Sequence, residues 1–288
     1  MDGNDIKKEY ARICRGIQKD FGKSYYFATL FFPKEKKLAT QVLYAFFRMP
    51  DEIVDNPAGS DIEEIKASLN GWKTKWEAAY KNGYSDDPIL DPSAKIFRKY
   101  DIPYSLSEAF IDAMIMDTER SRYQNYDELK KYMFGSAAAV GLMMSRIIGF
   151  SEKKALEYAE MLGYAMQLTN FLRDIREDYE NRGRIYLPQD EMARFGISEN
   201  DIKERHISDN FKKLMRFEID RAKQLYKEAE KGIPYLNKDG RFAVRMASVL
   251  YGAILDKIEK QDYDIFSKRA HTNIAEKVFL LIKEALKR

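Results

Sequence analysis

Amphipathic helical periodicity is the feature that most constrains what this chain can fold into. Apolar residues recur every three or four positions, with charged residues between them, in long stretches such as residues 63–80 and 209–231. This is the pattern of helices with one buried face. Sustained apolar–polar alternation, which would indicate strands, is found nowhere in the chain. The sequence therefore predicts an all-α fold: one domain over residues 1–288, with roughly ten or more helices and no internal repeat.

Composition and charge exclude several classes of protein. The 288 residues include 49 basic and 46 acidic side chains, so the net charge of +3 gives a weak field and does not suggest a nucleic-acid partner. The single cysteine, Cys14, excludes an internal disulfide and favours a reducing compartment. The N-terminus has no apolar signal segment, and the longest uncharged run, residues 132–145, is too short to span a bilayer. We therefore expect a cytoplasmic protein, able to sit at a membrane surface, with no obligate protein partner evident.

Two segments predict central helices because they are apolar over most of their circumference. They cover residues 132–150 and 155–175, and the first is rich in small residues between Gly135 and Gly141. Small residues permit either close packing of the helix against a neighbour or an apolar cavity beside it. The sequence leaves both open, and close packing is the commoner arrangement.

Two pairs of aspartates lie at the ends of apolar helical segments. Asp51 and Asp55 are four residues apart, as are Asp174 and Asp178, so both carboxylates of each pair project from one helix face. The spacing alone is uninformative, because a third such pair occurs in "DDPILDP" at residues 86–92. There the two prolines predict an ordinary solvated turn.

Carboxylates that share a buried helix face repel each other and must be neutralised. Salt bridges to the neighbouring Arg48, Arg173 and Arg176 are one remedy, and a divalent cation is the other. Magnesium suits such a site because it binds one or two carboxylates together with substrate phosphates, and manganese prefers similar ligands. The two histidines, His206 and His271, lack the Glu-x-x-His spacing of a di-iron bundle. Acids, arginines and apolar helices together fit an amphiphile with a diphosphate head and a hydrocarbon tail.

Five segments, in this order, resemble the squalene and phytoene synthase family of isoprenoid synthases. The likeness extends from about Ile13 to about Arg269, and the second aspartate segment with its RGRIYLP continuation is the most specific part. It implies a helical bundle around a central apolar cavity. The segments are "GKSYYFATLFFP" (22–33), "LYAFFRMPDEIVD" (43–55), "MDTERSRYQNYDELKKYMFGSAAAVGLMM" (116–144), "YAMQLTNFLRDIREDYENRGRIYLP" (164–188) and "YGAILDKIEKQDYDIFSKR" (251–269).

The resemblance also implies roles for individual residues. Lys268 stands where the family often has arginine, and supplies a cation without the bidentate fork. Arg182 and Arg184 are either surface charges or parts of a flap that closes over the head group. The implied metal ligands are Asp51, Asp55, Asn170, Asp174 and Asp178. The residues implied to contact substrate, diphosphate or the reaction centre are Ser24, Tyr44, Arg48, Tyr132, Gln167, Arg173, Arg184, Tyr251 and Lys268.

The implied reaction is head-to-head condensation of two prenyl diphosphates. Ionisation of the first gives an allylic cation, which the double bond of the second attacks to form a cyclopropylcarbinyl diphosphate. A second ionisation and rearrangement give the product. The cavity must exclude water, and the aromatic faces expected to stabilise positive charge are those of Tyr44, Tyr132, Phe134 and Tyr251.

Two C20 substrates (geranylgeranyl diphosphate) would give phytoene, which is the preferred expectation. Two C15 substrates (farnesyl diphosphate) would give presqualene diphosphate, squalene or dehydrosqualene, and only a squalene synthase would need NADPH. Alternatives of other kinds are a one-substrate terpene cyclase and a non-catalytic relative that acts as a binding or assembly factor. The tyrosine and GSAAAVG segments speak against the cyclase, and the presence of both aspartate clusters speaks against the non-catalytic relative.

Two positions depart from the family pattern. Glu52 stands where most members have aspartate, and keeps the negative charge. Pro50 removes a backbone donor and predicts a kink or restart of the helix just before Asp51. Substrate length should be set by cavity depth. The residues expected to form the cavity floor are Phe27, Phe31, Phe46 and Met143.

Overall fold

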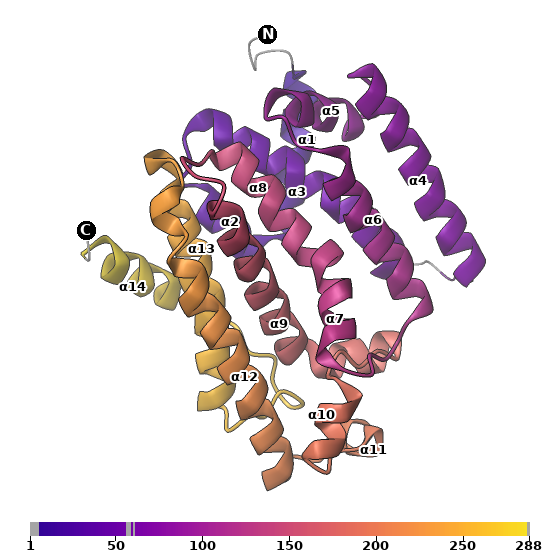
Figure 1. Ribbon diagram of the computed structural model, residues 1–288, viewed down its shortest axis with the longest axis vertical. Helices are drawn as coiled ribbons and strands as arrows, with labels where there is room; N and C mark the ends of the chain where they lie inside the picture. Colours follow the sequence, from indigo (N-terminus) through magenta and orange to yellow (C-terminus); the bar gives the residue numbers. More distant parts are fainter. Residues whose placement is uncertain (1–5, 56–58, 60, 287–288) are drawn as a thin grey trace.

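Helices make up most of the described chain, as the periodicity predicts (Figure 1). The computed structural model describes residues 6–55, 59 and 61–286. Within these ranges, the only extended pairing is an isolated bridge between Phe150 and Leu236, so the all-α prediction is confirmed. The α-helices are α1 (Lys8–Phe21), α2 (Lys23–Thr29), α3 (Lys34–Asp55), α4 (Ile62–Asn82), α5 (Leu90–Lys99), α6 (Tyr104–Glu119), α7 (Tyr126–Met133), α8 (Ala139–Ile148), α9 (Ala155–Arg182), α10 (Gln189–Arg194), α11 (Glu199–Lys203), α12 (Asp209–Glu230), α13 (Lys238–Lys260) and α14 (Ile274–Ala285).

Helix α9 forms the centre of the bundle, because it carries apolar residues on several sides. Tyr164, Ala165, Leu168 and Phe171 are all buried, and the helix packs against α8, α12 and α13. Figure 1 shows α9 in the middle of the molecule, with α12 and α13 on one side and α8 on the other. The prediction that residues 155–175 form a central helix is confirmed.

The other predicted central helix is divided. Between α7 and α8, residues Phe134–Ala138 form one π-helical segment, η2. A Cβ atom added to Gly135 in this segment would lie 2.2 Å from the carbonyl oxygen of Ala109 and 2.7 Å from the Cβ of Ala113. Only glycine allows η2 to approach α6 this closely, so close packing is the correct interpretation at this position.

Two local predictions hold only in part. Helix α3 runs through Pro50 without a restart, which excludes the restart and leaves the kink a prediction. Residues 86–89 form a turn, as predicted, but α5 already begins at Leu90, so Pro92 falls in the first turn of that helix and its missing N–H breaks no helical bond. Asp91 is 4% exposed and its carboxylate lies 3.0 Å from Lys95 Nζ, so the prediction of a solvated turn is wrong there. Most of the break predicted at residues 56–60 lies outside the described residues.

Helix length and hydropathy bear on membrane insertion. No helix in the described ranges is both long and apolar enough to cross a bilayer.

Replacing Gly135 with alanine should lower the free energy of unfolding by about 1–3 kcal/mol, because the methyl group must displace the backbone of α6. Urea denaturation followed by circular dichroism measures the change. Gly71→Ala in α4 is the matched control: a Cβ there meets no atom within 4 Å, so that variant should gain about 0.5–1 kcal/mol. Equal effects of the two substitutions would contradict the packing account.

Candidate active site

One face of α9 lines an apolar cavity and then continues into the second aspartate pair. The lining positions recur every three or four residues, and Asp174 and Asp178 follow one and two turns after the last of them. The same helix face therefore changes from apolar to acidic. The lining residues of α9 are Ala155, Tyr158, Ala159, Leu162, Gly163, Met166, Gln167 and Asn170.

Helix α3 repeats this arrangement with the first pair. Its cavity-lining positions end at Asp51, and Asp55 follows one turn later. Both helices thus present a hydrocarbon-compatible surface at one end of the cavity and carboxylates at the other. The lining residues of α3 are Thr40, Leu43, Tyr44, Phe47, Arg48 and Asp51.

The cavity has a volume of about 370 Å³. Along α9 it extends from Ala155 to Asn170, which corresponds to about 22 Å of helix. Small residues on η2 and α8 also line it, including Ala137 and Gly141, so the cavity interpretation of these residues is confirmed. Gly141 serves close packing as well, because an added Cβ would lie 2.6 Å from the carbonyl oxygen of Ala159.

The end of the cavity farthest from the carboxylates has other walls than those predicted. Phe46 faces away from the lining stripe of α3 and packs on Trp76 and Phe97, with ring centroids 4.6 Å and 5.7 Å away. The predicted floor of Phe27, Phe31, Phe46 and Met143 is therefore wrong, since none of them lines the cavity. The residues that close the far end are Phe32, Ile148, Ala155, Leu236 and Ala243.

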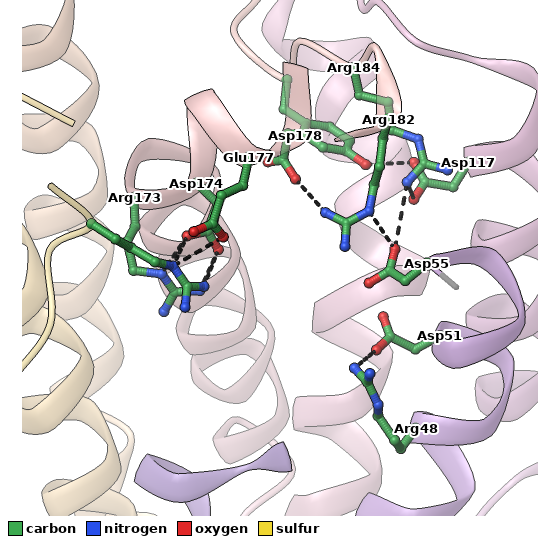
Figure 2. A network of polar contacts seen from close by, with 12 residues as sticks. Arg48, Asp51, Asp55, Asp117, Arg173, Asp174, Glu177, Asp178, Arg182 and Arg184 are labelled. Carbon is green, nitrogen blue, oxygen red and sulfur yellow. Dashed lines mark hydrogen bonds and ion pairs between the residues drawn. The ribbon is translucent and has the colours of Figure 1, made fainter. Parts of the chain in front are cut away.

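Arg182 joins the two aspartate pairs (Figure 2). Its Nε lies 2.9 Å from Asp55 Oδ1, and its Nη1 lies 3.0 Å from Asp178 Oδ1. Nearby, Arg48 Nη1 lies 2.5 Å from Asp51 Oδ2 and also pairs with Glu52. The structure thus neutralises these carboxylates with salt bridges, one of the two possibilities that the sequence left open. Arg182 connects the first aspartate pair with the second.

Asp174 is held separately from the other acids, as Figure 2 shows. Arg173 donates to it from Nε at 2.8 Å and from Nη2 at 2.5 Å. Arg269 also donates to both of its oxygens, at 2.8 Å and 3.0 Å. The adjacent Lys268 has an exposed side chain, and its role as a cation for diphosphate stays a prediction; the contact with Asp174 comes from Arg269, with the bidentate geometry that lysine lacks.

The loop after α9 returns to the site because Gly183 ends the helix. Gly183 has a left-handed conformation, with φ of 62°, which glycine adopts without strain. The backbone N–H of Arg184 then donates to the carbonyl oxygen of Asp178 at 2.9 Å, and Ile185 N–H donates to Ser121 O at 3.0 Å. Arg182 and Arg184 are therefore held over the carboxylates, and the alternative that they are surface charges is wrong.

Asp117 is a site residue that sequence reasoning missed. It is 7% exposed at the end of α6, accepts a hydrogen bond from Tyr186 Oη at 2.7 Å and lies 3.0 Å from Arg184 Nη1. The signal was available, because Asp117 continues the buried stripe of α6 that includes Phe110 and Met114.

Aromatic rings stand beside the acids in two groups. Tyr132 stacks with Tyr186 at 5.6 Å between centroids, and Tyr186 stacks with Phe171 at 4.1 Å. Tyr25 lines the cavity and contacts the other two predicted tyrosines, Tyr251 at 4.8 Å and Tyr44 at 6.3 Å.

Two expected contact residues need separate mention. Phe134 is 37% exposed and does not line the cavity, which contradicts its expected role. Ser24 belongs to α2, and its side chain lies outside the described part of the structure.

Burial and mutual repulsion make Asp51, Asp55 and Asp178 harder to ionise. Burial, reinforced by the charge of Asp55, raises the pKa of Asp51 to about 7, although the Asp51 side chain is 40% exposed and water lessens this effect. Burial and the charge of Asp174 raise the pKa of Asp178 to about 7. At Asp174 burial acts in the same direction, but the hydrogen bonds from Arg173 and Arg269 outweigh it and lower the pKa.

The donor set fits magnesium bound jointly with a substrate. Asn170 Oδ1 is buried at the cavity mouth and accepts no hydrogen bond, and the raised pKa values of Asp51 and Asp178 mark a place where a cation would relieve repulsion. Among the residues that the structure describes, no three His, Cys, Asp or Glu side chains are close enough to hold a metal on their own. A magnesium ion would fit both the repelling acids and the small number of protein ligands, because it would take its other ligands from substrate phosphates and water.

Comparisons with known proteins all point to one family. A family model described as squalene/phytoene synthase matches residues 18–276. The 15-cis-phytoene synthase of Synechocystis sp. is 35% identical over 286 residues, covering 95% of this chain and 84% of that protein. Phytoene synthase 1 of Arabidopsis thaliana is 35% identical over 275 residues, covering 93% of this chain and 64% of the plant protein, so the chain spans somewhat less than two thirds of it.

Solved structures agree with this fold. A dehydrosqualene synthase in complex with ligand superposes with a TM-score of 0.91 at 27% identity, covering 99% of both chains. The squalene synthase HpnC from Alicyclobacillus acidocaldarius superposes with a TM-score of 0.81 at 23% identity, covering 89% of this chain and 95% of that one, and supports the fold alone.

Asp178→Asn should stabilise the metal-free protein at pH 8. Because the folded-state pKa of Asp178, about 7, lies above its unfolded value, the protonated acid is favoured in the folded state, and stability is lost as pH rises from about 4 through 7. The variant lacks this titration and should be about 1–3 kcal/mol more stable than wild type at pH 8 in EDTA, and close to it at pH 4. Denaturant unfolding across this pH range measures the difference.

Asp112→Asn provides the control for that experiment, because its carboxylate forms an exposed pair with Lys73 and such pairs contribute little. If Asp178→Asn showed the same pH dependence of stability as the wild type, the raised pKa of Asp178 would be contradicted.

Proposed function

The chain belongs to the squalene/phytoene synthase family, and we propose that it joins two molecules of geranylgeranyl diphosphate head to head to make phytoene. One observation carries this proposal. The two aspartate pairs continue the cavity-lining faces of α3 and α9, so a ligand whose hydrocarbon tail fills the cavity has its head group among carboxylates and arginines. The 35% identity to the phytoene synthases of Synechocystis and Arabidopsis supports the C20 substrate.

The head group would be bound by magnesium and arginine together. Asp51, Asp55, Asn170, Asp174 and Asp178 would hold magnesium, which supplies Lewis-acid stabilisation of the departing diphosphate. On the protein side, Arg182 would leave Asp55 and Asp178 when a diphosphate arrives, because the cation then neutralises those acids. Its guanidinium would become available to donate to phosphate oxygens in bidentate fashion.

The remaining arginines have positions that suit the second diphosphate. Arg173 and Arg269 converge on Asp174, and Arg184 lies over Asp117 and Asp55. Each is held in place by a carboxylate, so the donors are oriented before substrate binds and little reorganisation is needed.

The walls of the cavity protect the carbocations. A cation formed near the mouth would face Tyr44 and Tyr25, whose rings stabilise positive charge without capturing it. The apolar lining excludes water, which would otherwise trap the cation. The proposal for Tyr132 is indirect: its ring buttresses Tyr186, which hydrogen-bonds Asp117.

A C15 substrate is the second candidate, because the superposition with a dehydrosqualene synthase covers 99% of the chain. Condensation of two farnesyl diphosphates would give presqualene diphosphate, squalene or dehydrosqualene, with NADPH consumed only for squalene. A binding or assembly factor without catalysis is the third.

Incubation with magnesium and either C20 or C15 diphosphate, with and without NADPH, separates these functions. We expect a C40 hydrocarbon from the C20 substrate, formed without NADPH and identified by its mass. A C30 product as the main one would move the assignment to the squalene branch. No consumption of either substrate, while a control enzyme works, would leave the binding factor.

Filling the far end of the cavity should shorten the accepted chain. Ala155→Leu and Ala243→Leu place extra carbons against Ile148 and Leu236, so the ratio of C40 to C30 product should fall at least tenfold. Phe27→Leu, at a position that does not line the cavity, is the control and should leave the ratio unchanged. An unchanged ratio in both alanine variants, with normal thermal stability, would contradict this orientation of the substrate.

A further inference from the structure

A groove on the outer side of α2 carries a strong positive charge. It has a volume of about 780 Å³ and is bounded by α1, α2, the start of α3 and the end of α5. Among the described residues that line it, the only acid is Glu35, whose carboxylate lies 3.1 Å from Lys99 Nζ. The cations that line it are Lys8, Arg12, Arg15, Lys34, Lys37 and Lys99.

The cations of α1 form a row that helix stability does not explain. Lys8, Arg12, Arg15 and Lys19 follow one another at intervals of four, three and four residues, and all four side chains are exposed. None of their side chains makes a hydrogen bond or an ion pair to another described residue. Like charges at this spacing repel and destabilise a helix, so the row points to an anionic partner.

An apolar stripe lies on a second helix, α14. Figure 1 shows α14 projecting from the side of the bundle next to α13. Its large apolar side chains share one face of the helix, and Lys277 and Lys283 flank that face on its two sides. The exposed fractions along the stripe are 81% for Ile274, 42% for Val278, 66% for Phe279, 54% for Ile282 and 82% for Leu286.

Helix α2 connects these two features with the active site. Burial, and after it the positive charge of Lys23 on α2, lower the pKa of Lys277 on α14. Tyr26 and Leu30 of α2 line the basic groove, whereas Tyr25 and the residues one turn later line the cavity. The basic groove and the cavity are thus opposite sides of one short helix.

We propose that this surface, made of the α1 cations, the basic groove and the apolar stripe of α14, docks the enzyme on an anionic phospholipid bilayer. The apolar stripe would lie in the interfacial region, and the cations would contact lipid phosphates, which is the behaviour of basic amphipathic helices. The inference rests on the proposed function to this extent: a C20 substrate tail and a hydrocarbon product both need a lipid phase.

Other occupants fit less well. A nucleic acid would satisfy the cations but leave the apolar stripe in water. A second copy of the chain could cover the stripe, but it would bring the same excess of lysine and arginine towards the first copy, and like charges disfavour such an interface. A bilayer with anionic lipids matches both features at once.

Co-sedimentation of the full chain with vesicles tests the proposal without any substrate. We expect binding to phosphatidylcholine vesicles that contain phosphatidylglycerol, weaker binding at high salt, and little binding to pure phosphatidylcholine. Lys8→Gln/Arg12→Gln/Arg15→Gln should weaken binding to anionic vesicles by one to two orders of magnitude. Phe279→Ser/Ile282→Ser should weaken it at least tenfold.

Matched variants control for net charge and surface hydrophobicity. Lys153→Gln/Lys203→Gln/Lys227→Gln removes the same charge from exposed positions elsewhere, and Ile62→Ser/Tyr84→Ser removes exposed apolar side chains from the α4 region. Both should bind vesicles like wild type. Equal losses in test and control variants, or equal binding to neutral and anionic vesicles, would overturn the proposal.

Two further readouts keep the outcomes distinct. Light scattering in the absence of lipid should show no oligomer that Phe279→Ser/Ile282→Ser dissociates; such an oligomer would assign the stripe to a second copy and overturn the proposal. Turnover of detergent-solubilised substrate should be unchanged in the triple α1 variant. Vesicle binding by a chain that converts no prenyl diphosphate would contradict the proposed function and leave the docking surface standing.

Discussion

Repulsion among the aspartates of two facing helices is the constraint on which the rest of the structure depends. Asp51, Asp55 and Asp178 all have raised pKa values, with burial as the leading cause, and the single guanidinium of Arg182 lies between two of them. A site that existed only to stabilise the fold would gain by replacing these acids with apolar residues. Their presence makes sense when a second cation and an anionic ligand complete the balance.

The fold supplies what this charge cluster needs. Because α3 and α9 each keep one face towards the cavity over several turns, the surfaces proposed to bind the tail and the head group lie on the same two helices. The close approach of η2 to α6 at Gly135 fixes how these two segments pack. The left-handed turn at Gly183 fixes the direction of the loop after α9. Gly183 matters most for chemistry, since it directs the loop with Arg184 back over the carboxylates instead of into solvent.

Much of this was predictable from the sequence, for identifiable reasons. Helical periodicity indicated the all-α fold, and the i, i+4 spacing of the aspartates indicated which carboxylates share a face; the family match over residues 18–276 confirms the resemblance drawn from the segments. The predictions that failed would have required knowledge of which way each helix face points, or of which segments of the chain lie side by side. Phe46 is apolar and close in sequence to Arg48, yet it faces Trp76 instead of the cavity. Arg269, which the sequence did not single out, reaches Asp174. Asp117 was missed because a single acid forms no spacing pattern. Its position on the buried stripe of α6 was nevertheless a usable signal.

The central claim is that the two aspartate pairs form one site and share one ligand. A double-mutant cycle of Asp55→Asn and Asp178→Asn, measured as the affinity for inorganic diphosphate in the presence of magnesium by calorimetry, tests it directly. If both acids act on the same bound cation and diphosphate, the single losses will not add, and the coupling energy will be about 1–3 kcal/mol. Strictly additive losses would show that the two motifs bind independently and would contradict the account.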